Sequence, residues 1–459
     1  MVKSLGDSLR RFSQLQGRNL KDACATAKSC IVLPSRAVLG YQKLNSYKPE
    51  LGLPKLSNYQ YKRIISDNLL QLVKSYPALV LTGPRQVGKT TLLKELFPTY
   101  NYVSLDGVLE ASLAEESPEE FLHRYPPPVL IDEVQYAPKL FRHLKSAIDN
   151  HRHDHGRFIL TGSQKFQLMA GVSESLAGRV AIVELETLML SEILTEQPRL
   201  FDQQRLEEIL IRGFFPELWR NMNMDPTEFY RSYVATYLER DLRQIIQVTS
   251  LRDFDRFMRS CATRSGSLLN KSDLAKDLGT SAKTIHSWLN ALEASNQVML
   301  LEPYFGNLQK RLIKTPKLYF ADVGLLSFLL NASSEQLSQH PLIGGIWETF
   351  VYSEIRKYIK NHNMRAQLYF YRDQQSREVD FVIETGGYLH LIECKWKEIP
   401  QASDAKTLSL LQKEINLVKS IHLIGRSQQP GVWPGPIHVW GGQHISEMME
   451  FIRSGGPHR

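Results

Sequence analysis

The sequence predicts an α/β fold with a mostly parallel sheet, followed by a helical region and a second, C-terminal α/β domain. Short apolar strands separated by segments of helical length are typical of a parallel sheet with helices on both faces. A helical periodicity follows, and then a helix, several strands and another helix. The expected strands of the first sheet are 78–82, 102–105, 129–131, 157–160 and 180–184. With 459 residues the chain has room for about three domains, which we expect at 55–195, 203–305 and 340–445.

The composition is that of a globular protein. Hydrophobic residues make up 42% and charged residues 23%, and the 27 Gly and 22 Pro are scattered, which excludes collagen-like and wholly disordered chains. No apolar run approaches the roughly 18 residues of a membrane helix, so no membrane-spanning part is expected. The four cysteines form no CxxC pair, which indicates neither a zinc site nor a disulfide framework. A reducing, cytoplasmic compartment is the expected location.

Residues 1–45 differ from the rest of the chain. They carry eight Lys or Arg side chains and only two acidic ones, which is most of the formal net charge of +8. We expect a basic, disordered extension. A mitochondrial transit peptide is an alternative, because it is also rich in Arg and Ser and poor in acids. The net charge permits a polyanionic partner without demonstrating one.

A glycine-containing loop follows the first predicted strand. Residues 83–90 fit GxxxxGK[ST] at every fixed position, between that strand and a predicted helix. In such a loop, backbone N–H groups surround phosphate oxygens, Lys89 reaches the β and γ phosphates, and Thr90 ligates Mg²⁺. The sequence therefore predicts a P-loop NTPase domain with ATP and Mg²⁺ as cofactors. The expected nucleotide contacts in the loop are Gly83, Pro84, Arg85, Gln86, Val87, Gly88, Lys89, Thr90 and Thr91.

The second half of this site is predicted about forty residues further along the chain. The apolar strand 129–131 places Asp132 where it can join Thr90 in the Mg²⁺ shell, and Glu133 where it can polarise water. We expect Lys89 and Glu133 to be catalytic. A plain surface glutamate is the alternative for Glu133.

Two more residues are candidates for the same chemistry. Ser163 follows the strand 157–160 in the segment 161–164 and is a candidate sensor of the γ-phosphate, or else a hydroxyl that closes a turn. Arg179 is a candidate arginine finger, offered within the chain or to a neighbouring subunit. A surface salt bridge is the alternative for Arg179.

The region 203–305 carries two patterns. An aromatic stripe at 229–242 has helical spacing, for which core packing is the expected role. Residues 271–290 have a helix-turn-helix pattern, in which Gly279 makes the turn and Ile285 with Trp288 packs the second helix onto the first. The presumed recognition helix contains no arginine, so DNA contact and a purely structural or protein-binding winged helix both stay open. Its candidate contacts are Lys283, Thr284, His286, Ser287 and Asn290.

Two alternating strands near the C-terminus carry carboxylates. Glu378, Asp380 and Val382 are expected to share one face of the first strand, and Glu393 and Lys395 one face of the second, so that a hairpin brings these faces together. Asp380 and Glu393 beside Lys395 would suit a second Mg²⁺ that activates water at a phosphodiester. Glu348 or Glu354 of the preceding helix is a candidate further ligand. The alternative is a cross-strand ladder of ion pairs.

Taken together, these motifs resemble a family of prokaryotic AAA-type P-loop ATPases with a C-terminal domain of unknown function. The resemblance runs from about Tyr59 to Gly425. It implies an ATP-binding core, a winged-helix middle and a C-terminal domain similar to the PD-(D/E)XK nuclease fold, with Asp380, Glu393 and Lys395 at the motif positions. The family markers are segments 81–91, 213–217, 237–242, 316–325 and 378–381. No proline precedes Asp380, which departs from the nuclease pattern.

The leading functional expectation is a Mg²⁺-dependent ATPase that acts on DNA or is regulated by it. One alternative is a nucleotide-gated switch that binds a protein partner with little turnover. A further alternative couples the ATPase to metal-dependent nuclease activity. Relatives of the AAA type often assemble as rings, so a homo-oligomer is a further expected partner state.

Overall fold

The structure is a computed structural model of the chain. It describes residues 61–163, 165–198, 201–238, 251–305, 314–434 and 437–455. The expected basic extension at 1–45 lies outside the described residues, as do Gln164 and most of the marker segment 237–242.

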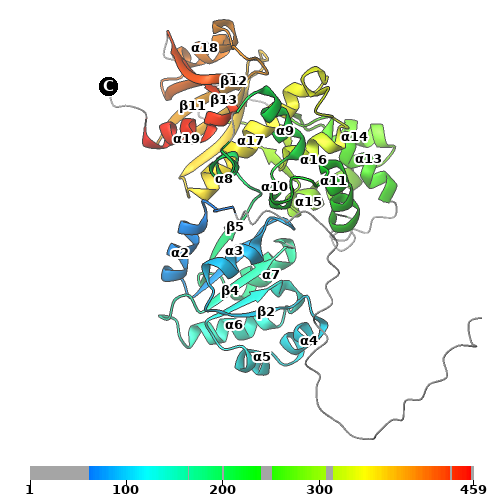
Figure 1. Cartoon of the computed structure of the whole chain (residues 1–459), viewed down its shortest axis with the longest axis vertical. Coiled ribbons are helices and arrows are strands. Elements are labelled where there is room, and N and C mark those ends of the chain that lie inside the picture. The colour runs from blue at the N-terminus through cyan, green and yellow to red at the C-terminus, as the bar shows by residue number, and fades with distance from the viewer. Residues whose placement is uncertain are drawn as a thin grey trace, which may run out of the picture. The chain divides into compact units, whose positions relative to one another are not determined.

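The first domain contains a five-stranded sheet. Its strands are β1 (Ala78–Thr82), β2 (Asn101–Ser104), β3 (Val129–Asp132), β4 (Phe158–Gly162) and β5 (Val180–Glu184). All neighbours are parallel, in the order β2-β3-β4-β1-β5 (Figure 1). This confirms the predicted P-loop NTPase-like parallel sheet. Because the strands are parallel, the carboxyl ends of β1, β3 and β4 meet at one edge.

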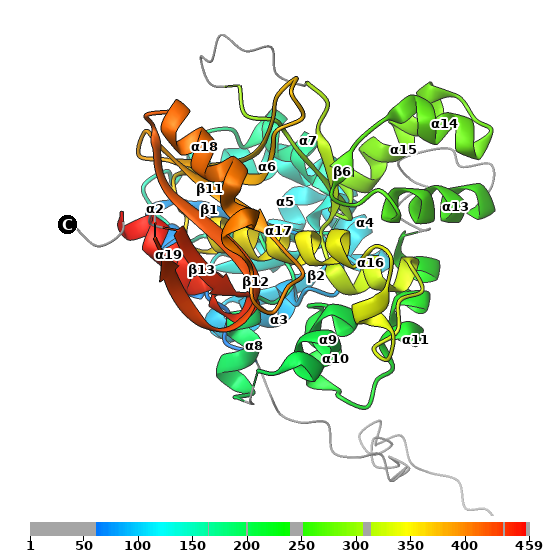
Figure 2. The same ribbon diagram turned by 90° about the horizontal axis from the view of Figure 1, so that it is seen from above.

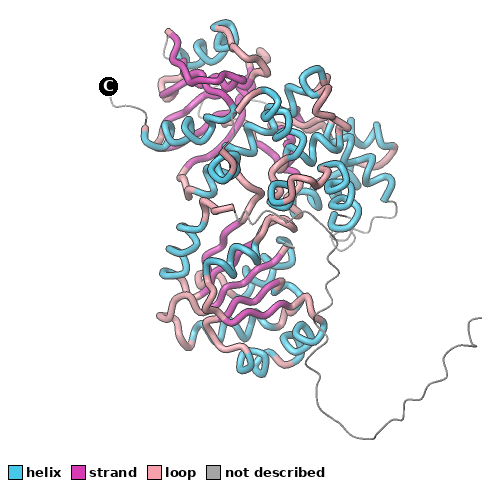
Figure 3. Tube along the Cα trace, in the orientation of Figure 1, coloured by secondary structure: helices cyan, strands magenta, loops and turns pink. Residues whose placement is uncertain are grey.

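Helices cover both faces of this sheet, as the alternation of side chains in β1 requires. Leu79 and Leu81 pack with the helices on one face, and Ala78 and Val80 with those on the other. The first face is covered by α2 (Ser66–Ser75) and α3 (Lys89–Leu96). The second face is covered by α4 (Val108–Glu116), α5 (Pro118–Arg124), α6 (Leu140–Asp149) and α7 (Lys165–Ser175). Figure 3 shows these strands between helices.

A helical region follows β5. Phe229, Tyr230 and Tyr233 of its aromatic stripe are buried, so the expected core role is confirmed for these three. The remaining side chains of the stripe lie outside the described residues. The helices are α8 (Leu190–Glu196), α9 (Gln203–Arg212), α10 (Pro216–Arg220), α11 (Pro226–Tyr233), a π-helical turn (Val234–Leu238) and α13 (Leu251–Ala262).

The predicted helix-turn-helix consists of α14 (Lys271–Leu278) and α15 (Ala282–Ala294). Gly279 ends α14 with φ +64°, in the left-handed region that glycine tolerates. Trp288 packs against the rings of Phe254 and Phe257, so it joins α15 to α13. The three-stranded sheet beside it has the order β6-β8-β7 and is formed by β6 (Ser267–Leu268), β7 (Val298–Leu301) and β8 (Lys317–Phe320).

The C-terminal part contains a mixed five-stranded sheet in the order β13-β12-β11-β10-β9. Strands β9, β10 and β11 pair antiparallel, and β11, β12 and β13 pair parallel. Helices α17 and α19 pack on one face and α18 on the other; Figure 2 shows the three helices around the sheet. The elements are α16 (Val323–Leu329), α17 (Ile343–Asn361), β9 (Ala366–Arg372), β10 (Glu378–Thr385), β11 (Tyr388–Cys394), α18 (Lys406–Glu414), β12 (Val418–Trp433), β13 (Ile437–Gly441) and α19 (Ile445–Ser454).

The hairpin of β10 and β11 is confirmed, but one side-chain assignment in it is wrong. The pairing of β10 with β9 shifts register between Val379 and Val382. As a result Val382 packs in the same apolar cluster as Val379, whereas Glu378 and Asp380 both approach Lys317. Val382 therefore does not share the face of the two carboxylates, because an irregular residue changes the phase of a strand.

One continuous apolar cluster joins the three sequence regions. It includes Leu81 of the first sheet, Phe214 of the helical region and Phe350 of α17. Phe214 and Phe350 stack with ring centroids 6.0 Å apart. In the described part of the chain, no helix is both long and apolar enough to span a bilayer.

Candidate ATP site and C-terminal carboxylate cluster

The predicted phosphate loop lies between β1 and α3, and two of its residues must be glycine. Gly83 has φ +144°, and a Cβ there would lie 2.0 Å from the carbonyl oxygen of Leu185. Gly88 has φ +89° and is the N-cap residue of α3. The loop therefore packs directly against the backbone that follows β5, and its turn into α3 depends on a left-handed residue.

The Lys89 ammonium points back into the loop. Its Nζ donates to the carbonyl oxygens of Gly83 at 3.0 Å and Pro84 at 2.8 Å, and the residue is 7% exposed. Val87 is buried, Arg85 and Thr90 are half-buried, and Gln86 and Thr91 are exposed. All nine predicted nucleotide contacts thus lie on one loop and the first turn of α3, where N–H groups and the helix dipole favour phosphate.

Asp132, at the end of β3, accepts hydrogen bonds from three hydroxyl groups. Thr90 Oγ1 donates to its Oδ2 at 2.8 Å, Tyr102 OH donates to the same oxygen at 3.1 Å, and Thr161 Oγ1 donates to Oδ1. Burial first, and then the Asp132 charge, raises the pKa of Tyr102 to about 12. A hydroxyl and a carboxylate oxygen in direct contact are donors that Mg²⁺ prefers, so Thr90 and Asp132 fit a Mg²⁺ ion.

Glu133 follows Asp132 in a left-handed backbone conformation, with φ +55°. Its Oε2 accepts hydrogen bonds from Ser163 Oγ at 2.9 Å, from the Ser163 N–H at 3.2 Å, and from Gln135 Nε2. Burial alone would raise the pKa of Glu133, but the Lys89 charge and these hydrogen bonds lower it below its usual value. The site therefore holds an ionised, oriented carboxylate. Ser163, the predicted sensor, contacts Glu133.

Arg179 lies elsewhere, and the prediction that it serves its own chain as an arginine finger is wrong. The residue precedes β5, whose first residue Val180 pairs with Ala78 at the start of β1. The phosphate loop follows the opposite, carboxyl end of β1. Arg179 forms a two-pronged ion pair with Asp149, at 2.6 and 3.0 Å. A role toward a neighbouring subunit stays a prediction.

Arg63 contacts the phosphate loop, although the sequence pattern did not single it out. Its Nη1 donates to the carbonyl oxygen of Val87 at 3.1 Å, its Nη2 to that of Glu186 at 2.8 Å, and its Nε to Glu192 at 3.2 Å. The residue is 6% exposed. Arg63 precedes α2 and matches no motif, so no local signal distinguishes it from a surface arginine.

The segment after β5 is held by α17. Arg356 pairs with Glu186 at 2.6 Å, Lys360 pairs with Glu184 at 2.5 Å, and Lys357 Nζ donates to the Leu188 carbonyl oxygen at 2.7 Å. The backbone of Leu185, in this segment, packs on Gly83. The segment therefore connects α17 to the phosphate loop.

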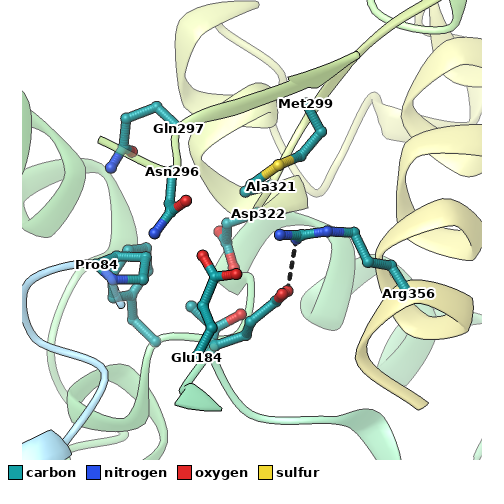
Figure 4. Close-up of a pocket in the computed structure, with 11 residues that line it drawn as sticks. Pro84, Glu184, Asn296, Gln297, Met299, Ala321, Asp322 and Arg356 are labelled. Carbon is teal, nitrogen blue, oxygen red and sulfur yellow. Dashed lines mark hydrogen bonds and ion pairs between the residues drawn. The ribbon is translucent and has the colours of Figure 1, made fainter. Parts of the chain in front are cut away.

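A small cavity lies beside the loop (Figure 4). It is lined by Pro84, by Glu184 at the end of β5, and by Asn296 and Asp322 of the middle region, and Arg356 points into it. Its volume is about 20 Å³, which is room for roughly one water molecule. The cavity is therefore too small for a nucleoside. Its lining shows that the phosphate loop and the middle region face one another across it.

The marker segments 213–217 and 316–325 meet at Asp322. Its carboxylate accepts hydrogen bonds from the Phe214 N–H at 2.9 Å, from Tyr230 OH at 2.7 Å and from the Gly324 N–H at 3.0 Å. A Cβ on Gly213 would lie 2.2 Å from the Tyr230 hydroxyl. These markers therefore have a structural role, because the buried carboxylate fixes the start of α16 against α9 and α11.

The C-terminal carboxylates gather at one place, which supports the expected cluster. Lys395 Nζ lies 2.6 Å from Glu393 Oε1, and Asp380 Oδ2 accepts from the Cys394 N–H at 2.8 Å. Burial first, and then the charge of Asp380, raises the pKa of Glu393 to about 8. Of the two candidate further ligands, Glu348 belongs to this cluster, because Lys317 Nζ lies 3.0 Å from its Oε1 and 3.8 Å from Asp380 Oδ1. Burial first, and then the charge of Asp380, raises the pKa of Glu348 to about 7.

Glu354, the other candidate ligand, lies away from the cluster, so that alternative is wrong. Its carboxylate accepts from the Leu190 N–H at 2.9 Å and pairs with Lys357 at 2.5 Å. It lies further along α17 than Glu348 and faces α8 instead. Among the residues that the structure describes, no group of three or more His, Cys, Asp or Glu side chains has the arrangement of a metal site.

Comparison with known families divides the chain in three. Residues 75–194 match the family described as "AAA domain". Residues 203–336 match a domain of unknown function (DUF8612), and residues 343–432 match a second domain of unknown function (DUF4143).

Known proteins resemble the chain over much of its length. Uncharacterized proteins of Mycobacterium bovis and Mycobacterium tuberculosis are each 30% identical over 390 residues, which is 81% of this chain and 85% of each relative. A solved Walker-type ATPase of Pyrococcus abyssi is 17% identical with a TM-score of 0.42, covering 60% of this chain and 98% of that one. A solved RuvB variant of Thermotoga maritima is 16% identical with a TM-score of 0.28, covering 51% of this chain and 88% of that one. The chain belongs to the family of AAA-type P-loop ATPases that carry a C-terminal domain of unknown function.

Proposed function

We propose that this protein is a Mg²⁺-dependent ATPase whose cycle moves the middle and C-terminal regions, and that it acts on DNA. The observation that carries the ATPase proposal is the hydrogen bond between Thr90 and Asp132, with the Glu133 carboxylate held by Ser163 beside it. The match of residues 75–194 to the AAA domain supports it independently.

In this proposal the phosphate loop binds the phosphates of ATP, and Glu133 activates the attacking water. Lys89 would exchange the carbonyl oxygens of Gly83 and Pro84 for β- and γ-phosphate oxygens, while the loop N–H groups bind the remaining oxygens. A bound Mg²⁺ would supply positive charge against the charge that develops on the phosphates. Glu133 would accept a proton from the attacking water, and Ser163 holds the carboxylate in place.

The connection to the rest of the chain suggests how turnover is used. Gly83 packs on Leu185, and the flanking Glu184 and Glu186 pair with Lys360 and Arg356 of α17. A change in the phosphate loop would therefore reach α17 through the backbone around Leu185 and the partly buried ion pairs. This is a physical route for coupling, and we propose it as one.

DNA is the proposed partner of α15. Lys283, His286 and Asn290 are exposed on this helix, and Lys271 Nζ lies 3.1 Å from His286 Nδ1. The surrounding order of helix, strand, two helices and two strands supports the proposal of a winged helix. The formal net charge of +8 permits a polyanionic partner.

The first test measures steady-state ATP hydrolysis by the full chain with Mg²⁺, with and without single- and double-stranded DNA, beside Lys89→Ala. The proposal expects turnover that Lys89→Ala abolishes and DNA raises. Absence of hydrolysis together with tight ATP binding would instead favour the alternative, a nucleotide-gated switch for a protein partner. Hydrolysis indifferent to DNA would remove DNA as the partner and leave the ATPase proposal standing.

A second test isolates α15. DNA affinity is measured against salt concentration for the full chain, for Lys283→Ala, and for Arg252→Ala as the matched exposed basic residue on α13. Loss of one phosphate contact should reduce the salt slope by about 0.9 for Lys283→Ala and leave it unchanged for Arg252→Ala. Equal effects of the two variants would contradict the assignment to α15. A cytoplasmic location, a homo-oligomer and the domain bounds 55–195, 203–305 and 340–445 stay predictions.

A further inference from the structure

The carboxylate cluster of the C-terminal domain contains a cation supplied by the chain itself. Lys317 is the first residue of β8, and only 2% of its side chain is exposed. Its Nζ lies 2.6 Å from Glu378 Oε1, 3.0 Å from Glu348 Oε1 and 3.8 Å from Asp380 Oδ1. A single ammonium therefore faces three carboxylates that come from α17 and β10.

We propose that Lys317 is the resident cation of this cluster and occupies the place of the divalent metal that the resemblance to nucleases implies. The residues present fit a divalent metal ion less well than they fit this ammonium. Mg²⁺ binds carboxylate oxygens at about 2.0–2.1 Å and needs about six oxygen donors. An ion bound to the oxygens of Glu348 and Glu378 would lie in contact with Nζ, because that atom already contacts both.

Further groups also contact the carboxylates of the cluster, although the buried Oε2 of Glu393 has no hydrogen-bond partner among the described residues. Arg372 pairs with Glu378 Oε2 at 3.1 Å, and Tyr319 OH donates to Glu348 Oε1. The Cys394 N–H donates to Asp380 and Lys395 pairs with Glu393. Four carboxylates thus meet three cationic side chains, Lys317, Arg372 and Lys395. The chain's own cations therefore offset most of the negative charge of the cluster, which weakens the electrostatic reason to bind a metal.

Lys317 also has no room to leave. It is 1% exposed, and its β8 is the central strand of the sheet β6-β8-β7. The neighbouring Tyr319 stacks on Tyr352 of α17 with ring centroids 4.4 Å apart. Since β8 belongs to the middle region, the ammonium fixes that region to the C-terminal domain. In this proposal the cluster is a buried structural contact between the middle region and the C-terminal domain. Asp380 then does not take part in metal-dependent cleavage.

The test measures Mn²⁺ binding by electron paramagnetic resonance on nucleotide-free full chain, in a Thr90→Ala background that removes a ligand of the ATP site. Four proteins are compared: this background alone, with Asp380→Asn, with Lys317→Met, and with both. The background and its Asp380→Asn variant should bind Mn²⁺ equally weakly. Lys317→Met should raise the affinity roughly ten-fold or more, and Asp380→Asn should abolish that gain.

The matched control is Lys395→Met, since Lys395 is the other lysine of the cluster but leaves 34% of its side chain exposed. It should give no comparable gain. An equal gain in Mn²⁺ affinity from Lys395→Met would overturn the assignment of Lys317 as the resident cation. Tight Mn²⁺ binding by the Thr90→Ala background, if Asp380→Asn abolished that binding, would overturn it too.

A second measurement covers the case in which Lys317→Met does not fold. The thermal midpoint of the nucleotide-free Thr90→Ala chain is compared in EDTA and in excess Mn²⁺, beside the same chain with Asp380→Asn. The proposal expects the same midpoint with and without metal, because no metal binds the folded cluster. A midpoint that Mn²⁺ raises in the Thr90→Ala chain but not in its Asp380→Asn variant would refute it. These readouts do not depend on ATP hydrolysis, so failure here leaves the ATPase proposal untouched.

Discussion

Thr90 donates a hydrogen bond to Asp132 at 2.8 Å, although 42 positions separate them in the chain. Thr90 lies in the first turn of α3, directly after the loop that follows β1, and Asp132 ends β3. Since β1 and β3 are parallel and separated only by β4, their carboxyl ends lie at one edge. The contact joins the two halves of the predicted ATP site.

Glu133→Gln should reduce ATP turnover by about 10²–10⁴-fold while leaving ATP binding intact, because only proton acceptance is lost. Turnover is measured at saturating ATP, and binding with a fluorescent analogue. Ser163→Ala is the graded control, since it removes one hydrogen bond to the same carboxylate and should cost less. Unchanged turnover in Glu133→Gln would mean that another group activates water, or that the chain is a switch.

Thr90→Ala and Asp132→Asn should each raise the Mg²⁺ concentration needed for half-maximal hydrolysis. The two side chains contact one another and are expected to hold one ion, so the double variant should be little worse than either single variant. Mg²⁺ titrations of turnover provide the measurement. Fully additive losses would indicate that the two residues act on different steps.

Arg63→Ala should destabilise the chain by about 3–5 kcal/mol, because it leaves buried Glu192 without its cation and three carbonyl oxygens without a donor. Urea unfolding monitored by fluorescence measures this loss. Arg256→Ala is the matched control, since Arg256 forms an exposed pair with Asp253 at 3.6 Å and should cost about 0–1 kcal/mol. Similar losses for both variants would contradict the buried role of Arg63.

Arg179→Ala should leave the turnover of the dilute chain unchanged, because Arg179 lies at the sheet edge opposite the phosphate loop. The measurement is hydrolysis as a function of protein concentration. A fall of about 10³-fold that appears only where the chain self-associates would assign Arg179 to the site of a neighbouring subunit.

The C-terminal sheet should make the chain sensitive to acid. His390 Nδ1 lies 2.6 Å from Ser420 Oγ, and Ser420 Oγ lies 2.7 Å from His422 Nε2, while Trp440 donates to His422. Burial lowers the pKa of His390 from 6.5 to about 4 and that of His422 well below its usual value. The folded chain therefore keeps both rings neutral, whereas the unfolded chain protonates them below pH 6.5.

The contribution of neutral His390 to the free energy of unfolding is present above pH 6.5. It is lost as the pH falls from 6.5 toward 4, and the total loss is up to about 3 kcal/mol. Urea unfolding at pH 7.5 and pH 5, for the unmodified chain and His390→Gln, measures it. The variant should lose less stability between the two pH values. His153→Gln, an exposed histidine, is the control, and an equal effect of both variants would contradict the assignment.

Local sequence patterns determined the first sheet and the phosphate loop. Alternating and continuous apolar runs have the period of strands, and the spacing of Gly83, Gly88, Lys89 and Thr90 encodes a loop whose glycines adopt conformations that other residues rarely adopt. The residues needed for these features are neighbours in the chain, so the pattern is sufficient. The same reasoning predicted the β10–β11 hairpin from its two glycines.

Tertiary structure alone decided which distant residues meet. The order of strands placed Arg179 at the edge away from the phosphate loop, and an irregular residue in β10 separated Val382 from Asp380. Lys317 enters the carboxylate cluster, and Arg63 reaches the phosphate loop, only because separate elements pack on one another. Sequence patterns encode local period and turn, but the partner of a buried charge is selected by long-range packing, since a charge removed from water must be paired wherever the fold provides an opposite one.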